Sequence, residues 1–178
     1  RYKNRSNLLY YTLAVHPNQS RVKLYTIKNP INYSQTGWAS ILSNRLSNGK
    51  SKKELDTKDV KAMPLMDIIK KSKFKIIDLL QIDTEGFDYE VLKMFNFKIF
   101  KPILVQFEYI HLSKNEYKNS IYLLSNNGYK TIKKKNDIIA IKKNKINIIL
   151  IFYYLFFRLK DSIKSRFGFN WTAKNYLL

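Results

Sequence analysis

The chain has 178 residues, about the length of one domain, and 45% of them are hydrophobic, which excludes a mainly disordered protein. Because it has no cysteine and two histidines, it lacks the residues for a disulfide framework, a thiolate metal site or a histidine-rich metal site. The formal net charge of +20 is typical of proteins that bind nucleic acid or anionic membranes. It names no partner here, because Lys, Asn, Ile, Tyr and Phe, whose codons need only A and T, make up half of the chain.

The amino-terminal part is predicted to form two strands followed by a long loop. Residues 8–15 are rich in Leu, Tyr, Thr and Val and end at a turn around Pro17, and residues 21–27 alternate as in a strand. Residues 29–53 are rich in Ser, Asn and Gly, which predicts a loop. The sequence begins at Arg1 without the charged and apolar start of a signal peptide, so we expect it to begin inside a longer protein.

Strands and helices alternate along residues 58–142. The run 75–82 is almost continuously apolar, which predicts a strand buried on both faces at the centre of a parallel sheet. The predicted order is a strand at 58–63, a helix at 64–71, a strand at 75–82, a helix at 86–95, a strand at 102–109, a helix at 116–126 and a hairpin of strands at 129–134 and 138–142. This order indicates an α/β domain with a mostly parallel sheet and an antiparallel hairpin at one edge.

Carboxylates follow two of these predicted strands. Asp83 and Glu85 flank Thr84 after the apolar run, Gly86 allows a sharp turn into the next helix, and Glu108 lies at the end of the following strand. Ligands of open α/β sheets bind beyond the carboxyl ends of the strands. A carboxylate there can accept a proton, orient a hydroxyl or hold a cation. The alternative is that Asp83 and Glu85 merely cap the following helix.

The same region resembles the FkbM-type methyltransferase family. The resemblance is carried by the run IIDLLQIDTEGFDYEVL at 76–92 together with Lys101-Pro102 and Phe107-Glu108, and it extends from Asn7 to Lys143. Leu13-Ala14-Val15, the run GWASI at 37–41 and Gly128-Tyr129 follow in the family's order. The resemblance implies a Rossmann-like fold and an S-adenosylmethionine-dependent methyltransferase that O-methylates hydroxyls on sugars, glycolipids or polyketides.

Two departures from the family pattern stand out. Gln81 occupies a position where the family usually has Lys, which removes one positive charge near the acids. No glycine precedes Gly37, so the glycine-rich cofactor loop that family members carry is absent, as is the acidic residue for the ribose. We therefore expect the chain to lack the first two strands of the family's sheet, either as a fragment or by degeneration.

The resemblance also implies roles for individual residues. Asp83 is expected to act as the base or to orient the acceptor. Glu85 is expected to be the partner of Asp83 or to contact a ligand. Glu108 is expected to contact the acceptor or to support the residues that do. Ala14 and Val15 are expected near the adenine of the cofactor. Asp83 is also expected to contact the cofactor. A magnesium site of Asp83, Glu85 and Glu108 is chemically feasible, but no metal site is predicted. His111, just past the strand that ends at Glu108, could reach the pocket, but as a loop histidine it is expected to be solvated.

The carboxyl-terminal segment 144–178 is predicted to be a helical tail, separate from a partial methyltransferase domain at 1–143. Residues 146–157 are apolar except for Asn147, which is shorter than the roughly 20 residues that span a bilayer. Cations then alternate with apolar residues to about residue 167, so the tail is either a buried helix or a helix lying on a membrane surface.

Three functions are weighed. The first is a methyltransferase whose acceptor is a small molecule or a glycan- or lipid-linked group, in the cytoplasm or peripheral at the membrane. The second is a non-catalytic remnant or interaction module. The third is a basic domain that binds a membrane surface or nucleic acid, with nucleic acid the less expected partner. The order of the motifs favours the first, the missing glycine loop favours the second, and the net charge of +20 with the apolar tail favours the third.

Overall fold

The computed structural model describes residues 8–31, 35, 37–47 and 54–146. The chain divides into two units, Arg1–Lys142 and Lys143–Leu178, and of the second unit only a 3-10 helix, Lys143–Lys145, and Ile146 are described. The tail expected at 146–167 therefore lies almost entirely outside the described residues, and the boundary expected after residue 143 stays a prediction. No helix among the described residues is long and apolar enough to cross a membrane.

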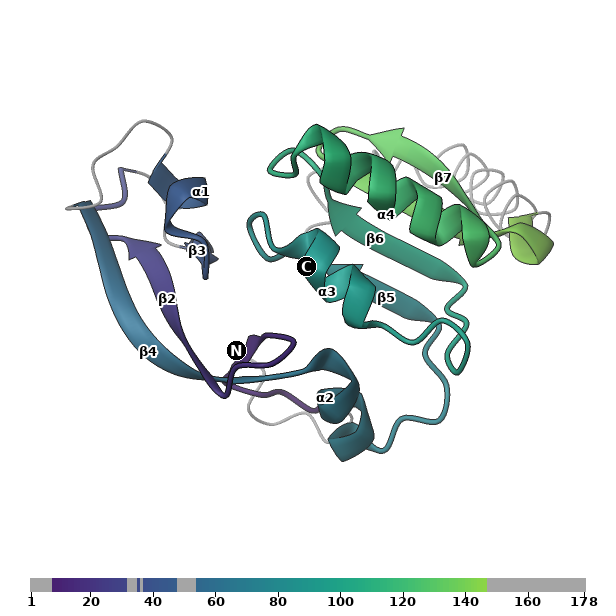
Figure 1. Ribbon diagram of the computed structural model, residues 1–178, viewed down its shortest axis with the longest axis horizontal. Coiled ribbons are helices and arrows are strands. Elements are labelled where there is room, and N and C mark those ends of the chain that lie inside the picture. The colour runs from purple at the N-terminus through teal and green to yellow at the C-terminus, as the bar shows by residue number, and fades with distance from the viewer. Residues whose placement is uncertain (1–7, 32–34, 36, 48–53, 147–178) are drawn as a thin grey trace, which may run out of the picture. The chain divides into compact units, whose positions relative to one another are not determined.

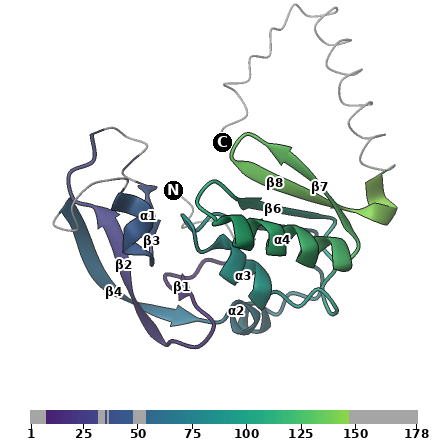
Figure 2. The same ribbon diagram turned by 45° about the horizontal axis from the view of Figure 1, so that its top comes forward.

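The first sheet is formed by the amino-terminal residues and is mostly antiparallel (Figure 2). Its strands run in the spatial order β1-β4-β2-β3; β1 and β4 pair in parallel, and the other pairs are antiparallel. A short helix, α1 (Ser43–Ser47), follows β3. The strands are β1 (Ala14–Val15), β2 (Arg21–Ile27), β3 (Ala39–Ser40) and β4 (Leu55–Met63).

The second sheet follows later in the chain and carries the candidate site (Figure 1). Its order is β5-β6-β8-β7, in which β5 and β6 are parallel and β8 is antiparallel to both of its neighbours. The strands are β5 (Leu79–Ile82), β6 (Leu104–Glu108), β7 (Tyr129–Lys134) and β8 (Asp137–Lys142), and the helices are α2 (Leu65–Ser72), α3 (Asp88–Met94) and α4 (Lys114–Asn126). Figures 1 and 2 show α3 and α4 over one face of this sheet.

The α/β class is confirmed, but the prediction of one mostly parallel sheet was wrong for the described strands. They form two sheets, and only the pairs β1/β4 and β5/β6 are parallel. Parallel neighbours need a crossover connection, usually a helix. Between β2 and β4 the described chain instead has β3 and the five-residue helix α1, and β4 returns antiparallel to β2. The carboxyl-terminal antiparallel hairpin is confirmed, with Lys135 and Asn136 between its strands.

Two strands differ from their predicted extents. The run at 75–82 forms a strand only at Leu79–Ile82, at the edge of the described sheet rather than its centre, and Leu79 is 51% exposed. The residues of β5 alternate between exposed and buried, so only one face of the strand is covered. The apolar run therefore marks a strand buried on one face and not, as predicted, on both. The strand expected at 8–15 is reduced to Ala14–Val15, and the loop expected at 29–53 contains β3 and α1.

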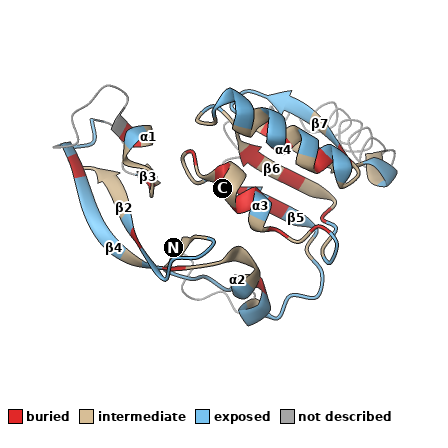
Figure 3. Cartoon of the chain, in the orientation of Figure 1, coloured by how far each residue is buried: buried red, intermediate tan, exposed pale blue. Residues whose placement is uncertain are grey.

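The core packs helices α3 and α4 against the second sheet. Figure 3 shows the buried residues concentrated on β6 and α3. Leu92, Val105, Phe107, Leu124 and Ala140 are fully buried in this cluster. Their burial fixes the position of α3 and β6, and therefore of the loops at the carboxyl ends of β5 and β6.

Candidate functional site

The loop between β5 and α3 has an unusual backbone. Glu85 has a φ of +52° and Gly86 a φ of +101°. The Ser40 hydroxyl donates a hydrogen bond to the Glu85 carbonyl at 2.9 Å, and a Cβ added at Gly86 would lie 2.8 Å from the Arg45 Cγ. Gly86 is thus required both by its φ and by the close approach of Arg45, which confirms the sharp glycine turn expected there.

Asp88 connects this loop to the end of β6. Its buried carboxylate accepts hydrogen bonds from the Thr84 hydroxyl at 2.9 Å, the Gly86 N–H at 3.2 Å and the Glu108 N–H at 3.3 Å. Burial raises the pKa of the Asp88 carboxyl, although the three hydrogen bonds favour its ionised form. Asp88 therefore holds the chain segments that carry Glu85 and Glu108 in a fixed relation.

Two carboxylates and one imidazole meet beyond the carboxyl ends of β5 and β6. The His111 Nε2 lies 3.2 Å from Glu85 Oε2 and 3.6 Å from Glu108 Oε2. The three side chains are 24%, 19% and 16% exposed, in the order His111, Glu85 and Glu108. The expectation that His111 is solvated was wrong, because a turn closed by Leu112 N–H donating to the Tyr109 carbonyl brings His111 back toward the end of β6.

Acidic side chains gather in this cluster, although the whole chain carries a net charge of +20. Burial raises the pKa of Glu108 to about 7, and the nearby carboxylates of Glu85, Asp83 and Asp88 act in the same direction. Burial and the charge of Asp83 also raise the pKa of Glu85, against the opposing effect of His111. Several carboxylates thus face a single imidazole.

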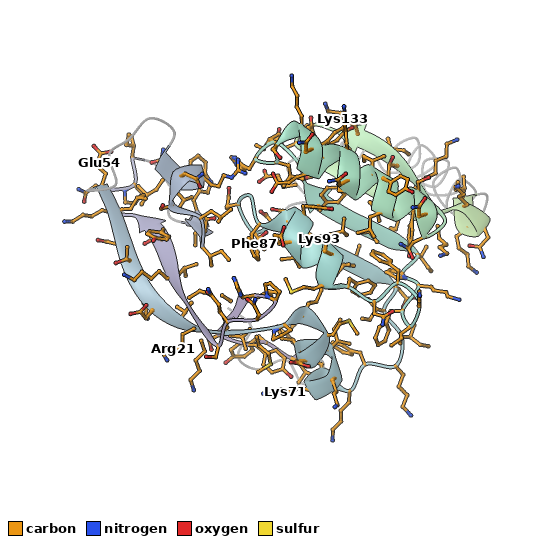
Figure 4. The ribbon with its side chains drawn as sticks, in the orientation of Figure 1. Arg21, Glu54, Lys71, Phe87, Lys93 and Lys133 are labelled. Atoms are coloured by element: carbon orange, nitrogen blue, oxygen red, sulfur yellow. The ribbon has the colours of Figure 1, made fainter. Side chains whose placement is uncertain are left out.

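A cavity of about 180 Å³ brings together the residues expected to contact a cofactor. Its lining includes Ala14 and Val15 from β1 and Asp83, Thr84 and Phe87 from the loop after β5. The side chain of Asp83 is exposed. Figure 4 shows Phe87 at the start of α3, and the His16 ring stacks on it with centroids 5.7 Å apart. We call this space the Asp83 cavity.

A larger cavity of about 610 Å³ lies over β2 and β4 and shares Leu13, Ala14 and Leu24 with the Asp83 cavity. Its lining is mixed, with Leu24 and Val60 beside the charged residues Arg21, Asp59 and Lys61. This volume is within the range of about 300–1,000 Å³ that is usual for small-molecule sites, whereas the Asp83 cavity is smaller.

The site residues expected from the sequence thus fall into two groups. Ala14, Val15 and Asp83 line one cavity, and Glu85 and Glu108 meet at His111. The supporting roles of Asp88 and Ser40 were not predicted from the sequence. Asp88 stands two residues after Gly86 in the sequence, but a carboxylate in the first turn of a helix is already explained by the helix dipole. Nothing in its position therefore indicated that it also holds the loop.

These features define a mixed α/β protein with a carboxylate-rich site at the ends of two parallel strands. The family model described as the methyltransferase FkbM domain matches residues 1–131, which is most of the chain. The chain therefore belongs to the FkbM methyltransferase domain family, as the motifs predicted. Comparison with curated proteins and with solved structures finds no match.

Proposed function

We propose that the chain serves S-adenosylmethionine-dependent O-methylation of a hydroxyl on a sugar, glycolipid or polyketide-like acceptor. Membership of the methyltransferase family supports the reaction class. The observation that carries the proposal for this chain is the Asp83 cavity, in which a strand-end carboxylate faces the same space as Ala14 and Val15.

The Asp83 cavity fits part of this cofactor. Ala14, Val15 and Phe87 offer an apolar wall suited to the adenine ring, but about 180 Å³ is too small for the whole molecule. The adjoining cavity of about 610 Å³ offers the additional space. When bound, S-adenosylmethionine supplies a methyl group on a positively charged sulfur, which an oxygen nucleophile can attack.

We further propose a Rossmann-like fold of which this chain carries the carboxyl-terminal part, and it is the second sheet that supports this. The parallel pair β5/β6 continues into the antiparallel hairpin of β8 and β7, as expected for the end of such a sheet. Among the described strands, β1 and β5 each lie at the edge of a sheet. These two edges are where the family's first two strands would pair.

Asp83 is the residue we propose to act on the acceptor. Its exposed carboxylate would accept a hydrogen bond from the acceptor hydroxyl, orient the oxygen and take up its proton. The cofactor would supply the methyl group, with S-adenosylhomocysteine leaving as the methyl–sulfur bond is replaced by the new C–O bond. Efficient transfer requires the oxygen to be held about 3–3.5 Å from the methyl carbon. Glu85 and Glu108 contact the rest of the acceptor, which is a small molecule or a glycan- or lipid-linked group in the cytoplasm or at the membrane surface.

A product assay tests this proposal on the full chain. The chain is incubated with millimolar S-adenosylmethionine and a panel of hydroxyl-bearing sugars, glycolipids and polyketide alcohols, and S-adenosylhomocysteine and methylated acceptor are measured by mass spectrometry. We expect product only with a hydroxyl acceptor, and Asp83→Asn should lower turnover more than cofactor affinity, because the carboxylate acts on the transition state. Asp67→Asn, an exposed position on α2, is the matched control. Methylation at nitrogen, or full turnover in Asp83→Asn, would contradict the assignment, and no product with any acceptor would favour a non-catalytic remnant.

A further inference from the structure

The Glu85, Glu108 and His111 side chains converge on one point. Each offers a ligand atom, and these atoms all lie within 4.8 Å of one another. Glu85 comes from the loop after β5, Glu108 from the end of β6 and His111 from the turn that follows. The set combines two carboxylates with an imidazole, so it differs from a patch of surface acids.

One atom of this set has no hydrogen-bond partner in the part of the chain that the structure describes. Glu108 Oε2 is inaccessible to solvent and has no hydrogen-bond donor there, and the His111 Nε2 lies 3.6 Å from it. The Arg45 guanidinium, which passes over Gly86, has its carboxylate partner in Glu116 at 3.6 Å. A buried carboxylate oxygen left in this state is costly unless a proton or a cation compensates it.

The backbone around the cluster is held in place before any ligand arrives. The Ser40 hydroxyl binds the Glu85 carbonyl, and Asp88 binds the N–H of Glu108 and of Gly86. Such outer contacts orient metal ligands and reduce the cost of ordering them. The partial exposure of all three side chains leaves a path for a small ion.

We propose that Glu85, Glu108 and His111 bind one divalent transition-metal ion. Two carboxylate oxygens and one imidazole nitrogen suit Mn²⁺, Fe²⁺, Co²⁺ or Zn²⁺, whereas Mg²⁺ and Ca²⁺ prefer oxygen ligands alone. Three protein ligands leave at least one coordination position open. A role for that position in holding the acceptor oxygen rests on the proposed methyl transfer, but metal binding itself does not.

The test uses Co²⁺ as the probe, with the full chain and neither S-adenosylmethionine nor acceptor present. Titration followed by visible absorption and by calorimetry is expected to give one ion per chain, displaced by Zn²⁺ and not by equal concentrations of Mg²⁺. His111→Gln and Glu108→Gln should each weaken binding by about tenfold or more. His16→Gln and Glu90→Gln are the matched controls, since they change the same residue types outside the cluster and should leave the affinity unchanged.

A second measurement on the unaltered chain avoids any failure of a variant to fold. Substoichiometric Mn²⁺ should broaden the ring signals of His111 in the NMR spectrum before those of His16. The proposal is overturned if millimolar Co²⁺ gives no saturable binding, if His111→Gln binds as well as the unaltered chain, or if Mn²⁺ broadens both histidines equally. Because neither cofactor nor acceptor is present, the result of the metal titration does not depend on whether the chain transfers methyl groups.

Discussion

Replacing Asp88 should reveal how strongly the site depends on one buried carboxylate. Asp88→Ala leaves the N–H groups of Gly86 and Glu108 without their acceptor. The Thr84 hydroxyl also loses its acceptor, but Thr84 is only half-buried and its hydroxyl can rotate. Two orphaned donors, one buried and one part-buried, at about 1–3 kcal/mol each amount to at most about 2–6 kcal/mol. Burial of the charge, which raises the pKa of Asp88, is relieved at the same time, so we expect a loss in the lower part of that range, about 2–4 kcal/mol. That is a large share of the roughly 5–15 kcal/mol that stabilises a typical domain.

Urea unfolding followed by circular dichroism measures this loss, and amide hydrogen exchange locates it. The Gly86 and Glu108 amides should exchange much faster in Asp88→Ala, whereas amides in β7 and β8 should change only with global stability. Asp67→Ala is the control, because Asp67 is an exposed acid in the first turn of α2 and should cost no more than about 0.5 kcal/mol. If both variants lost the same stability, Asp88 would not be holding the two loops together.

The remaining predictions concern the glycine turn and the start of α4. Gly86→Ala should lower the free energy of unfolding by about 1–3 kcal/mol, because the φ of +101° at Gly86 and the nearby Arg45 both oppose a side chain. Gly37→Ala is the control: a Cβ at Gly37 would have no atom within 4 Å, so the same denaturation assay should show almost no change. Ser113→Ala should cost about 1 kcal/mol, because it removes half of the capping box with Glu116. Burial alone would raise the pKa of Glu116, but the hydrogen bonds with Ser113 lower it. The stabilisation that the ionised Glu116 gives to the fold is therefore present above the pKa of Glu116 in the unfolded chain, and it is lost as the pH falls through the pKa of Glu116 in the folded chain. The effect of Ser113→Ala should therefore shrink in acid, and an effect that grew in acid would contradict this account.

The sequence predicted the strand-end acids because their positions follow from a local rule. An apolar run that ends in Asp83, and another that ends in Glu108, must place these acids at the same edge if the two strands are parallel neighbours, as they are. The same run gave the wrong position for β5, because apolar content does not reveal which edge of a strand is paired.

The missed residues depend on contacts between distant segments. His111 joins Glu85 through a turn whose closure is not encoded in a recognisable motif, and Ser40 reaches the Glu85 carbonyl from a segment that read as a polar loop. Asp88 had a sufficient local explanation at a helix start, so nothing in the sequence pattern called for a second role. Short elements such as β3 carry too few residues for any periodicity to appear.

The most direct test of the proposed function is an NMR titration of the chain, labelled with ¹³C at the alanine methyl groups, with S-adenosylmethionine. Ala14 and Ala39 line the Asp83 cavity, whereas Ala140 is fully buried in the second sheet. We expect the signals of Ala14 and Ala39 to shift progressively while that of Ala140 stays in place, with saturation only near millimolar cofactor, because the described residues surround only part of it. Absence of any shift at Ala14 and Ala39, or equal shifts at Ala140, would contradict cofactor binding at this site. Saturation at micromolar concentration would instead show that the chain holds a complete cofactor site.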